Sequence, residues 1–373
     1  MRFWLLLLVL LSGCLNQPER GVVSFYLGDD AFVTLESTCN FHEGNLVLKN
    51  GAENIVLNRV EEGVYSVPVF GGSVVGVERE DGVFCGVWTD SLRPNNYTIP
   101  LEIRPNPLRK PCGEPRVKST YDTSLGILSL ESFCDSVLGT FLTPTGDYRY
   151  LSGTVKNSVL NLNTFCGSHL FSFNALIKGD SLVNGVFRSG SHYTEMWDGV
   201  KNNNTVPGWL SSQKPNEDFN FKFTATNLDG KKVVINRETL VSSGKNVLVM
   251  DVLGTWCPNC YDEVMLLKEM VEKHPNAMFL SVAFERSENP YKRISEFKKE
   301  MGVDWSILYG GIASKVVADS VLPFLGGVKS FPTTLFLPIS GDPIVHTGFN
   351  GPATHLYPEE VEFYHNSING FNE

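Results

Sequence analysis

The chain has 373 residues, which is long enough for two ordinary domains and too long for one small module. Charged residues make up 19% and hydrophobic residues 42%, a balance typical of folded globular proteins rather than of disordered chains. The 31 basic residues are outnumbered by 41 acidic ones, the formal net charge is −10, and no basic run stands out. Because phosphate affinity needs clustered Lys and Arg, these numbers exclude a basic nucleic-acid-binding face.

The N-terminus has the pattern of a signal peptide. A short basic start precedes an unbroken apolar run of nine residues, Phe3–Leu11, which is too short to span a bilayer. The next residues, Leu11-Ser12-Gly13-Cys14, resemble the lipobox of bacterial lipoproteins, in which the signal is removed and the cysteine carries the lipid. We therefore expect a signal peptide over residues 1–13 and a lipidated tether over residues 14–19. An ordinary signal peptide with an incidental cysteine is the alternative.

Lipidation would decide the location of the protein. Several acyl chains on Cys14 would anchor a soluble chain durably at a membrane. Leu15, rather than Asp, follows Cys14, so the lipoprotein sorting rule favours the outer membrane over the inner one. We expect a bacterial cell-envelope protein that faces the periplasm, a compartment that permits disulfides.

Residues 20–200 have a β-rich pattern. Short runs that alternate apolar and polar residues recur along this region, for example Gly21–Leu27, Val83–Trp88 and Leu160–Asn163. Turn signals such as Asn50-Gly51 separate the runs at roughly regular spacing, and helical periodicity is nearly absent. Many short strands with such turns predict one accessory domain with a sandwich or barrel fold.

The β-rich region also holds an odd number of cysteines, so at least one should lack a partner within it. We expect Cys166 to be the unpaired one, and the pairing of the others stays open. A metal site formed by Cys166, His169 and His192 is an alternative, but ligand sets normally need three or four close groups, so we expect packing roles and no metal. The five cysteines are Cys39, Cys85, Cys112, Cys134 and Cys166.

A polar segment followed by Pro207-Gly208 predicts a linker over residues 201–217. The pattern then changes to alternating strands and helices over residues 218–373. The run Val247–Leu253 suits a buried central strand, and Val264, Leu267, Met270 and Val271 recur at helical spacing after it. Further strands and helices follow, ending in a hairpin and a C-terminal helix, so we expect an α/β domain with helices on both faces of its sheet. The predicted elements are strands at 277–284, 305–308, 333–337 and 344–348, and helices at 290–301 and 358–368.

A Cys-x-x-Cys motif, Cys257-Pro258-Asn259-Cys260, lies where the buried strand ends and the helix begins. Two intervening residues in a first helical turn bring both sulfurs within disulfide reach. The first sulfur lies at the helix N-terminus, where free N–H groups and the dipole stabilise a thiolate. We therefore expect Cys257 to be the exposed attacking thiol and Cys260 to be the more buried, resolving one. A structural or zinc-binding pair is the alternative, but the chain has no second Cys-x-x-Cys.

The region 218–370 resembles the TlpA/ResA-like thioredoxin family. The similarity is carried by Gly254-Thr255-Trp256-Cys257-Pro258-Asn259-Cys260 and by Ser330-Phe331-Pro332-Thr333-Thr334-Leu335-Phe336. The resemblance implies a thioredoxin fold in which Pro332, reached through a cis bond, lies opposite the cysteines. It also implies that substrate binds along Trp256, Phe331 and Pro332.

Two acidic residues match positions near the active site of thioredoxins and ResA-like proteins. Asp251 lies six residues before Cys257, and a buried carboxyl there would have a raised pKa and would accept the proton of Cys260. Glu263 lies three residues after Cys260 and matches a helix residue thought to tune the thiols, with a solvated helix residue as the alternative. His346 lies in a recurrent segment of the family, and we expect it on the strand surface.

The segments Gly139–Leu151 and Cys166–Phe171 look like the extra domain of some lipid-anchored TlpA-like proteins. The resemblance assigns this β-rich domain no activity. A binding module with an ancillary redox domain is therefore one alternative function.

The sequence as a whole predicts a lipid-anchored thiol–disulfide oxidoreductase without a cofactor. By resemblance it would reduce disulfides in other extracytoplasmic proteins, with apocytochrome c as one candidate, and would take electrons from a thiol-type donor in the membrane. A thiol peroxidase is the further alternative, because Lys222–Lys231 resembles the opening of peroxiredoxin-type domains. Peroxiredoxins place Thr three residues before the reactive cysteine, however, and this chain has Gly254 there.

Overall fold

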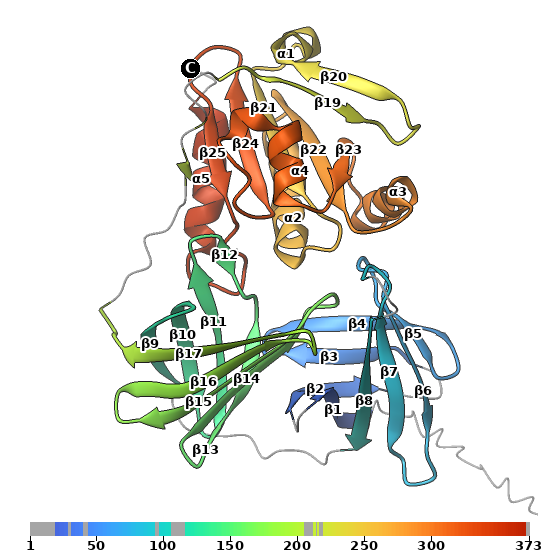
Figure 1. Ribbon diagram of the computed structural model, residues 1–373, viewed down its shortest axis with the longest axis vertical. Coiled ribbons are helices and arrows are strands. Elements are labelled where there is room, and N and C mark those ends of the chain that lie inside the picture. Colours follow the sequence, from blue (N-terminus) through green and yellow to red (C-terminus); the bar gives the residue numbers. More distant parts are fainter. Residues whose placement is uncertain are drawn as a thin grey trace, which may run out of the picture.

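The computed structural model describes residues 19–28, 31–39, 44–93, 97–105, 116–204, 212–213, 215 and 219–370. The predicted signal peptide, the lipid site at Cys14 and much of the predicted linker lie outside these ranges. Within them, no helix combines the length and the hydropathy needed to cross a membrane. The strands form three separate sheets, two from the β-rich region and one from the α/β region (Figure 1).

The first sheet is a closed antiparallel barrel. Each strand pairs with the next along the chain, and β1 closes the ring against β8. Alternate residues point inward, as in β8, where Ile99, Leu101 and Ile103 are buried. The strands are β1 (Glu19–Gly28), β2 (Ala31–Cys39), β3 (Leu46–Asn50), β4 (Glu53–Glu61), β5 (Val64–Ser66), β6 (Ser73–Glu78), β7 (Phe84–Asp90) and β8 (Tyr97–Pro105).

The second sheet is also antiparallel, and the pairing of β10 with β11 closes it into a ring. Its core is aromatic, with the ring of Phe173 stacked between those of Phe141 and Phe187 at 4.5 Å from each. Where one β-rich domain was predicted, the strands therefore pair within two barrels. The strands are β9 (Val117–Thr123), β10 (Gly126–Phe133), β11 (Ser136–Thr143), β12 (Gly146–Asp147), β13 (Leu151–Lys156), β14 (Val159–Phe165), β15 (Leu170–Lys178), β16 (Ser181–Ser189) and β17 (Tyr193–Lys201).

The two barrels share a packed contact. Phe165, at the end of β14, packs within the core of the first barrel, with its ring 5.1 Å from that of Phe25 and 5.3 Å from that of Trp88. The buried amide of Asn50 donates to the Phe165 carbonyl at 2.8 Å and accepts from its N–H at 3.2 Å. Burial of such a phenylalanine contributes about 1.5–3 kcal/mol, so the barrels form one module.

The third sheet has eight strands in the order β18-β25-β24-β21-β22-β23-β19-β20, of which β21, β22 and β23 run parallel. Along β21, Val247 and Val249 pack with α2 and α5, while Leu248, Met250 and Val252 pack with α4 on the other face. The elements are β18 (Ser212–Gln213), β19 (Lys222–Thr226), β20 (Lys232–Asn236), α1 (Arg237–Ser243), β21 (Val247–Leu253), α2 (Pro258–Lys273), β22 (Ala277–Glu285), α3 (Pro290–Met301), β23 (Ser306–Ile312), α4 (Lys315–Val321), a 3-10 turn (Pro323–Leu325), β24 (Thr333–Pro338), β25 (Ile344–Thr347) and α5 (Tyr357–Asn369).

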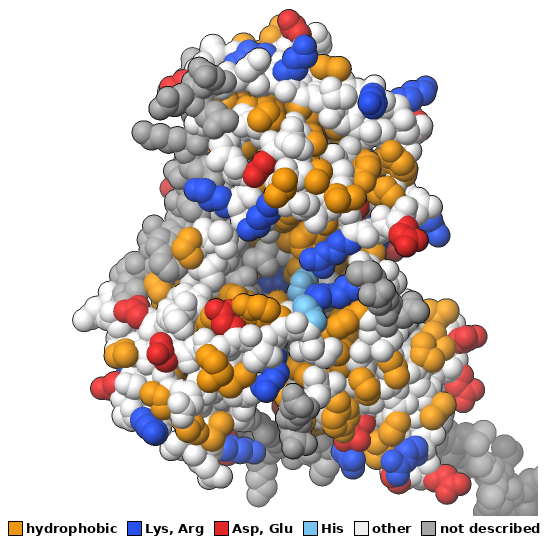
Figure 2. All heavy atoms as spheres, viewed as in Figure 1, with side chains coloured by type: hydrophobic (Ala, Val, Ile, Leu, Met, Phe, Trp, Pro, Cys, Tyr) orange, Lys and Arg blue, Asp and Glu red, His pale blue; other side chains and the backbone are white. Residues whose placement is uncertain are grey.

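This third unit has the strand–motif–helix order and the layers that the resemblance to thioredoxins implies. The sequence did not predict α1, α4 or the β19–β20 hairpin, and β18 pairs with β25 from within the predicted linker. The start of α2 faces the two barrels (Figure 1). The surface is hollowed where the third unit meets the barrels, and histidine and basic side chains gather at this hollow (Figure 2).

Candidate functional site

The Cys-x-x-Cys motif forms a disulfide at the start of α2. Cys257 immediately precedes the helix, Pro258 is its first residue, and the two Cα atoms of the cysteines are 5.3 Å apart. The Sγ of Cys257 accepts the N–H of Cys260 at 3.2 Å, so it caps the helix. Cys260 is fully buried, as predicted, but Cys257 is only 5% exposed rather than open to solvent. The exposure prediction failed because Cys257 belongs to an apolar cluster against which Val69 of the first barrel, Trp256 and Phe331 also pack.

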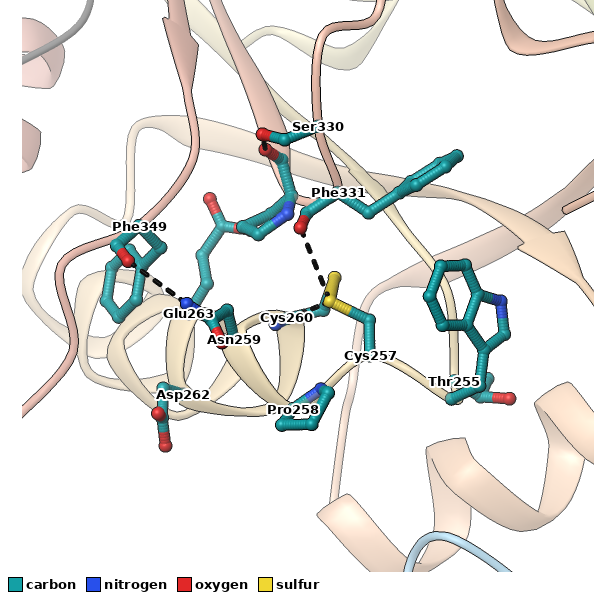
Figure 3. The surroundings of a disulfide bond; sticks show 12 residues. Thr255, Cys257, Pro258, Asn259, Cys260, Asp262, Glu263, Ser330, Phe331 and Phe349 are labelled. Atoms are coloured by element: carbon teal, nitrogen blue, oxygen red, sulfur yellow. Dashed lines mark hydrogen bonds between the residues drawn. A yellow bond between two sulfur atoms is a disulfide. The ribbon is translucent and has the colours of Figure 1, made fainter. Parts of the chain in front are cut away.

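The loop before β24 lies opposite the disulfide (Figure 3). The Phe331–Pro332 peptide bond is cis, as predicted. The carbonyl oxygen of Phe331 is 3.4 Å from the Sγ of Cys257, and its ring is 5.5 Å from the ring of Trp256. The indole N–H of Trp256 donates to the Phe284 carbonyl at 3.0 Å, which fixes the orientation of the ring. Trp256 and Phe331 therefore frame the sulfur of Cys257.

Two buried carboxyl groups lie in the interior near the motif. Asp251, on β21, accepts a hydrogen bond from Ser281 at 2.5 Å and is 1% exposed. Glu263, on α2, is completely buried and accepts hydrogen bonds from Thr334 and Tyr364. The second oxygen of each carboxyl has no hydrogen-bond partner among the described residues. Glu263 is thus no solvated helix residue. Its two partners could not be predicted from the sequence, because Thr334 and Tyr364 lie on other elements.

Burial raises the pKa of both carboxyls. Desolvation raises the pKa of Asp251 to about 7, although the hydrogen bond from Ser281 opposes the shift. Desolvation, followed by repulsion from Asp251, raises the pKa of Glu263 well above its ordinary value. These are the properties of groups that hold or accept a proton near neutral pH.

A second set of contacts ties both barrels to the first turn of α2. Arg149, which follows β12, forms ion pairs with Glu53 on the first barrel and with Asp262 on α2, the latter at 2.8 Å. Its guanidinium also donates to the carbonyl of Pro258, between the two cysteines, at 2.7 Å. Only 6% of the Arg149 side chain is exposed. Because each of the three units contributes a group, this cluster fixes the cysteine motif against the barrels.

Strand β12 adds contacts between the second barrel and the α/β unit, and we call these contacts and those of Arg149 the clamp. The carbonyl of Asp147 accepts from the side-chain amide of Asn259 at 3.0 Å, and its carboxylate accepts from the N–H of Gly351 at 2.6 Å. Gly146 has φ +113°, and a Cβ there would lie 2.8 Å from the Phe349 carbonyl oxygen. Only glycine fits this close approach. The sequence pattern did not single out these residues, because each partner lies more than 90 positions away.

The clamp carboxyls also have raised pKa values. Burial raises the pKa of Asp147 to about 6 and that of Asp262 to about 7, while Arg149 opposes both shifts.

The other described cysteines and His346 lie outside α2 and the loop that carries the motif. Cys166 is a buried free thiol, which confirms that prediction, and burial raises its pKa to about 11; Cys85 is a second free thiol. Cys134 is disulfide-bonded, Cys14 and Cys112 lie outside the described residues, and so does the side chain of Cys39. No group of three or more possible ligands for a metal occurs among the described residues. His346 was predicted on a surface but is 1% exposed, because its Nε2 contacts Glu360 of α5 at 2.6 Å.

The chain matches no family model and no curated protein sequence. Among solved structures, MTB dsbF aligns over 40% of this chain and 94% of its own, with 23% identity and a TM-score of 0.31. A secreted Mycobacterium tuberculosis disulfide oxidoreductase aligns over 38% and 95%, with 17% identity and a TM-score of 0.29. The exposed lipoprotein thioredoxin of Streptococcus pneumoniae aligns over 40% and 98%, with 20% identity and a TM-score of 0.28. The chain is therefore similar to these proteins over less than half of its length.

Asp251→Asn tests the raised pKa through the pH dependence of stability. Between about pH 4 and 7 the folded protein holds a proton on Asp251 that the unfolded chain releases, so the free energy of unfolding of the wild type falls as pH rises. Asparagine does not ionise. In denaturant unfolding with the disulfide intact, the free energy of unfolding of the variant should therefore rise by about 2–4 kcal/mol relative to that of the wild type between pH 4 and pH 8. Asp229→Asn, in the exposed β19–β20 turn, is the control; an equal, pH-independent difference for both variants would contradict the assignment.

Arg149→Met tests the clamp. The substitution leaves the carboxyls of Asp262 and Glu53 without their buried cation, and breaking such a pair costs about 3–5 kcal/mol of unfolding free energy. Adding Asp262→Asn should recover part of that loss. Arg104→Met, which breaks an exposed pair with Glu102, is the matched control and should leave the free energy of unfolding nearly unchanged. Equal losses for the two arginine variants in urea denaturation would show that the clamp does not stabilise the molecule.

Proposed function

We propose that the protein is a thiol–disulfide oxidoreductase whose working pair is Cys257 and Cys260. The observation that carries the proposal is the disulfide at the start of α2, whose outer sulfur faces the Phe331 carbonyl. Two buried carboxyl groups with raised pKa values in the same unit support it. A purely structural disulfide needs neither feature.

In the reducing direction, the Cys257 thiolate attacks one sulfur of a substrate disulfide. The substrate S–S bond breaks, one substrate sulfur leaves as a thiolate, and a mixed disulfide with Cys257 forms. The N–H of Cys260 and the positive end of α2 stabilise the attacking thiolate.

The resolving step then involves Cys260 and the buried acids. Cys260 loses its proton to the Asp251–Glu263 pair and attacks the Cys257 sulfur, which releases the second substrate thiolate. The Cys257–Cys260 disulfide forms, and the substrate has gained two electrons and, from solvent, two protons. An external thiol donor must then reduce the pair before the next turnover.

We extend the proposal to the location and partners. The lipobox-like segment ending at Cys14 supports a lipid-anchored protein in the bacterial envelope, facing the periplasm and more in keeping with the outer membrane. Its substrates would be disulfides of other extracytoplasmic proteins, apocytochrome c among the candidates, and its donor a thiol protein of the membrane. The barrel module would serve to hold the cysteine motif in place through Arg149.

Two cysteine variants test the proposed function. Cys257→Ser should abolish reduction of insulin by the reduced protein, because the attacking thiol is lost. Cys260→Ser should attack but not resolve, so it should accumulate a mixed disulfide that mass spectrometry detects on the Cys257 peptide. Cys166→Ser, which removes a buried free thiol, is the matched control and should keep insulin reduction. Unchanged insulin reduction by Cys257→Ser would refute the proposed function.

A further inference from the structure

One arginine next to the cysteine motif has no polar partner in the described part of the chain. Arg286 directly follows β22, and its guanidinium carbon lies 3.7 Å from the centroid of the Trp256 ring. Its side chain is exposed and forms no hydrogen bond or ion pair with any residue in the described ranges. Trp256 is the neighbour of Cys257 in the chain. The guanidinium of Arg286 is therefore stacked on the residue that precedes the proposed attacking cysteine.

Each barrel contributes one residue near Arg286, Arg93 from the first barrel and His192 from the second. Arg93, in the β7–β8 loop, contacts the Nε2 of His192 at 2.8 Å and forms an ion pair with Asp90 at 3.0 Å. His192 lies in the β16–β17 turn, and its Nδ1 is 3.2 Å from the hydroxyl of Tyr97. Figure 2 shows histidine and basic side chains gathered at the hollow between the third unit and the barrels. We call the group of Arg286, Arg93 and His192 the basic cleft.

The charges in the basic cleft are not balanced. Desolvation, and then repulsion from Arg93, lowers the pKa of Arg286 to about 10, while Asp90 and Glu285 oppose the shift. Those two carboxylates already face other cations, because Asp90 pairs with Arg93 and Glu285 lies near the buried guanidinium of Arg293. Burial and the nearby arginines lower the pKa of His192, so it adds no positive charge at neutral pH. One uncompensated guanidinium remains.

We propose that the basic cleft binds a carboxylate of the substrate, and that the protein therefore prefers substrate cysteines flanked by Asp or Glu. This inference rests on the proposed function. A carboxylate accepts parallel hydrogen bonds from the in-plane N–H edge of a guanidinium, and the stacking of Arg286 on Trp256 occupies only a face. The formal net charge of the chain is −10, so acidic partners are repelled elsewhere. The cleft would thus select both the partner and the orientation in which its disulfide meets Cys257.

The test compares two peptide disulfides that differ only in the residues beside the cysteine, two Glu in one and two Lys in the other. At low salt the reduced full chain should reduce the Glu peptide roughly five- to tenfold faster than the Lys peptide. Arg286→Gln should bring this ratio close to one, and Arg286→Lys should keep most of it. Lys232→Gln, on the exposed edge strand β20, is the matched control and should leave the ratio unchanged.

A second measurement uses the unaltered protein. Raising the salt concentration to about 1 M shortens the screening length to roughly 3 Å, so the preference of the wild type for the Glu peptide should disappear. Equal wild-type rates on the two peptides at low salt, or a ratio that survives Arg286→Gln, would overturn the basic-cleft proposal and leave the oxidoreductase standing. No exchange with either peptide would overturn the proposed function and the cleft together.

Discussion

The structure depends on one buried cation. The guanidinium of Arg149 pairs with a carboxylate of the first barrel and a carboxylate of α2, and it donates to the peptide carbonyl between the two cysteines. Transferring a charged group from water into the protein interior costs several kcal/mol, and the ion pairs and the hydrogen bond of Arg149 offset this cost. Glu53 lies on β4 of the first barrel, Asp262 and Pro258 lie on α2, and Arg149 itself follows β12 of the second barrel. Their juxtaposition therefore fixes how the barrels and the α/β unit sit around the cysteine motif.

This constraint has consequences for the chemistry. The apolar cluster that contains Cys257 packs against Val69 of the first barrel and against Phe331 of the α/β unit, and Cys257 is only 5% exposed. Restricted access favours partners whose shape and charge match the entrance. On the interior side of the motif, Asp251 and Glu263 are buried, and burial raises the pKa values of their carboxyl groups. The same packing thus limits what reaches the outer sulfur and prepares the proton acceptors for the inner one.

The sequence predicted the elements whose signals are local. The apolar run of β21, the helical spacing of α2 and the position of Cys257 before Pro258 each depend on neighbouring residues, and the structure has all three. The division of the β-rich region into two barrels was not predicted, because alternation reveals strands but not which of them pair. Arg149 and Arg286 were missed for a related reason. Nothing near Arg149 signals a contact with residues more than 90 positions away, and nothing near Arg286 signals a contact with Trp256, which follows the neighbouring strand β21.

The most direct test of the central claim is the reduction potential of the Cys257–Cys260 pair in the full chain. Equilibration against defined dithiol buffers, read by differential alkylation of the peptide that carries both cysteines, separates this pair from the other cysteines. We predict a reversible two-electron equilibrium between about −270 and −120 mV, the range of catalytic dithiols, and a value near −250 mV would fit the reducing direction. A potential below roughly −300 mV, the range of structural disulfides, or the absence of any equilibrium would contradict a redox role for this pair.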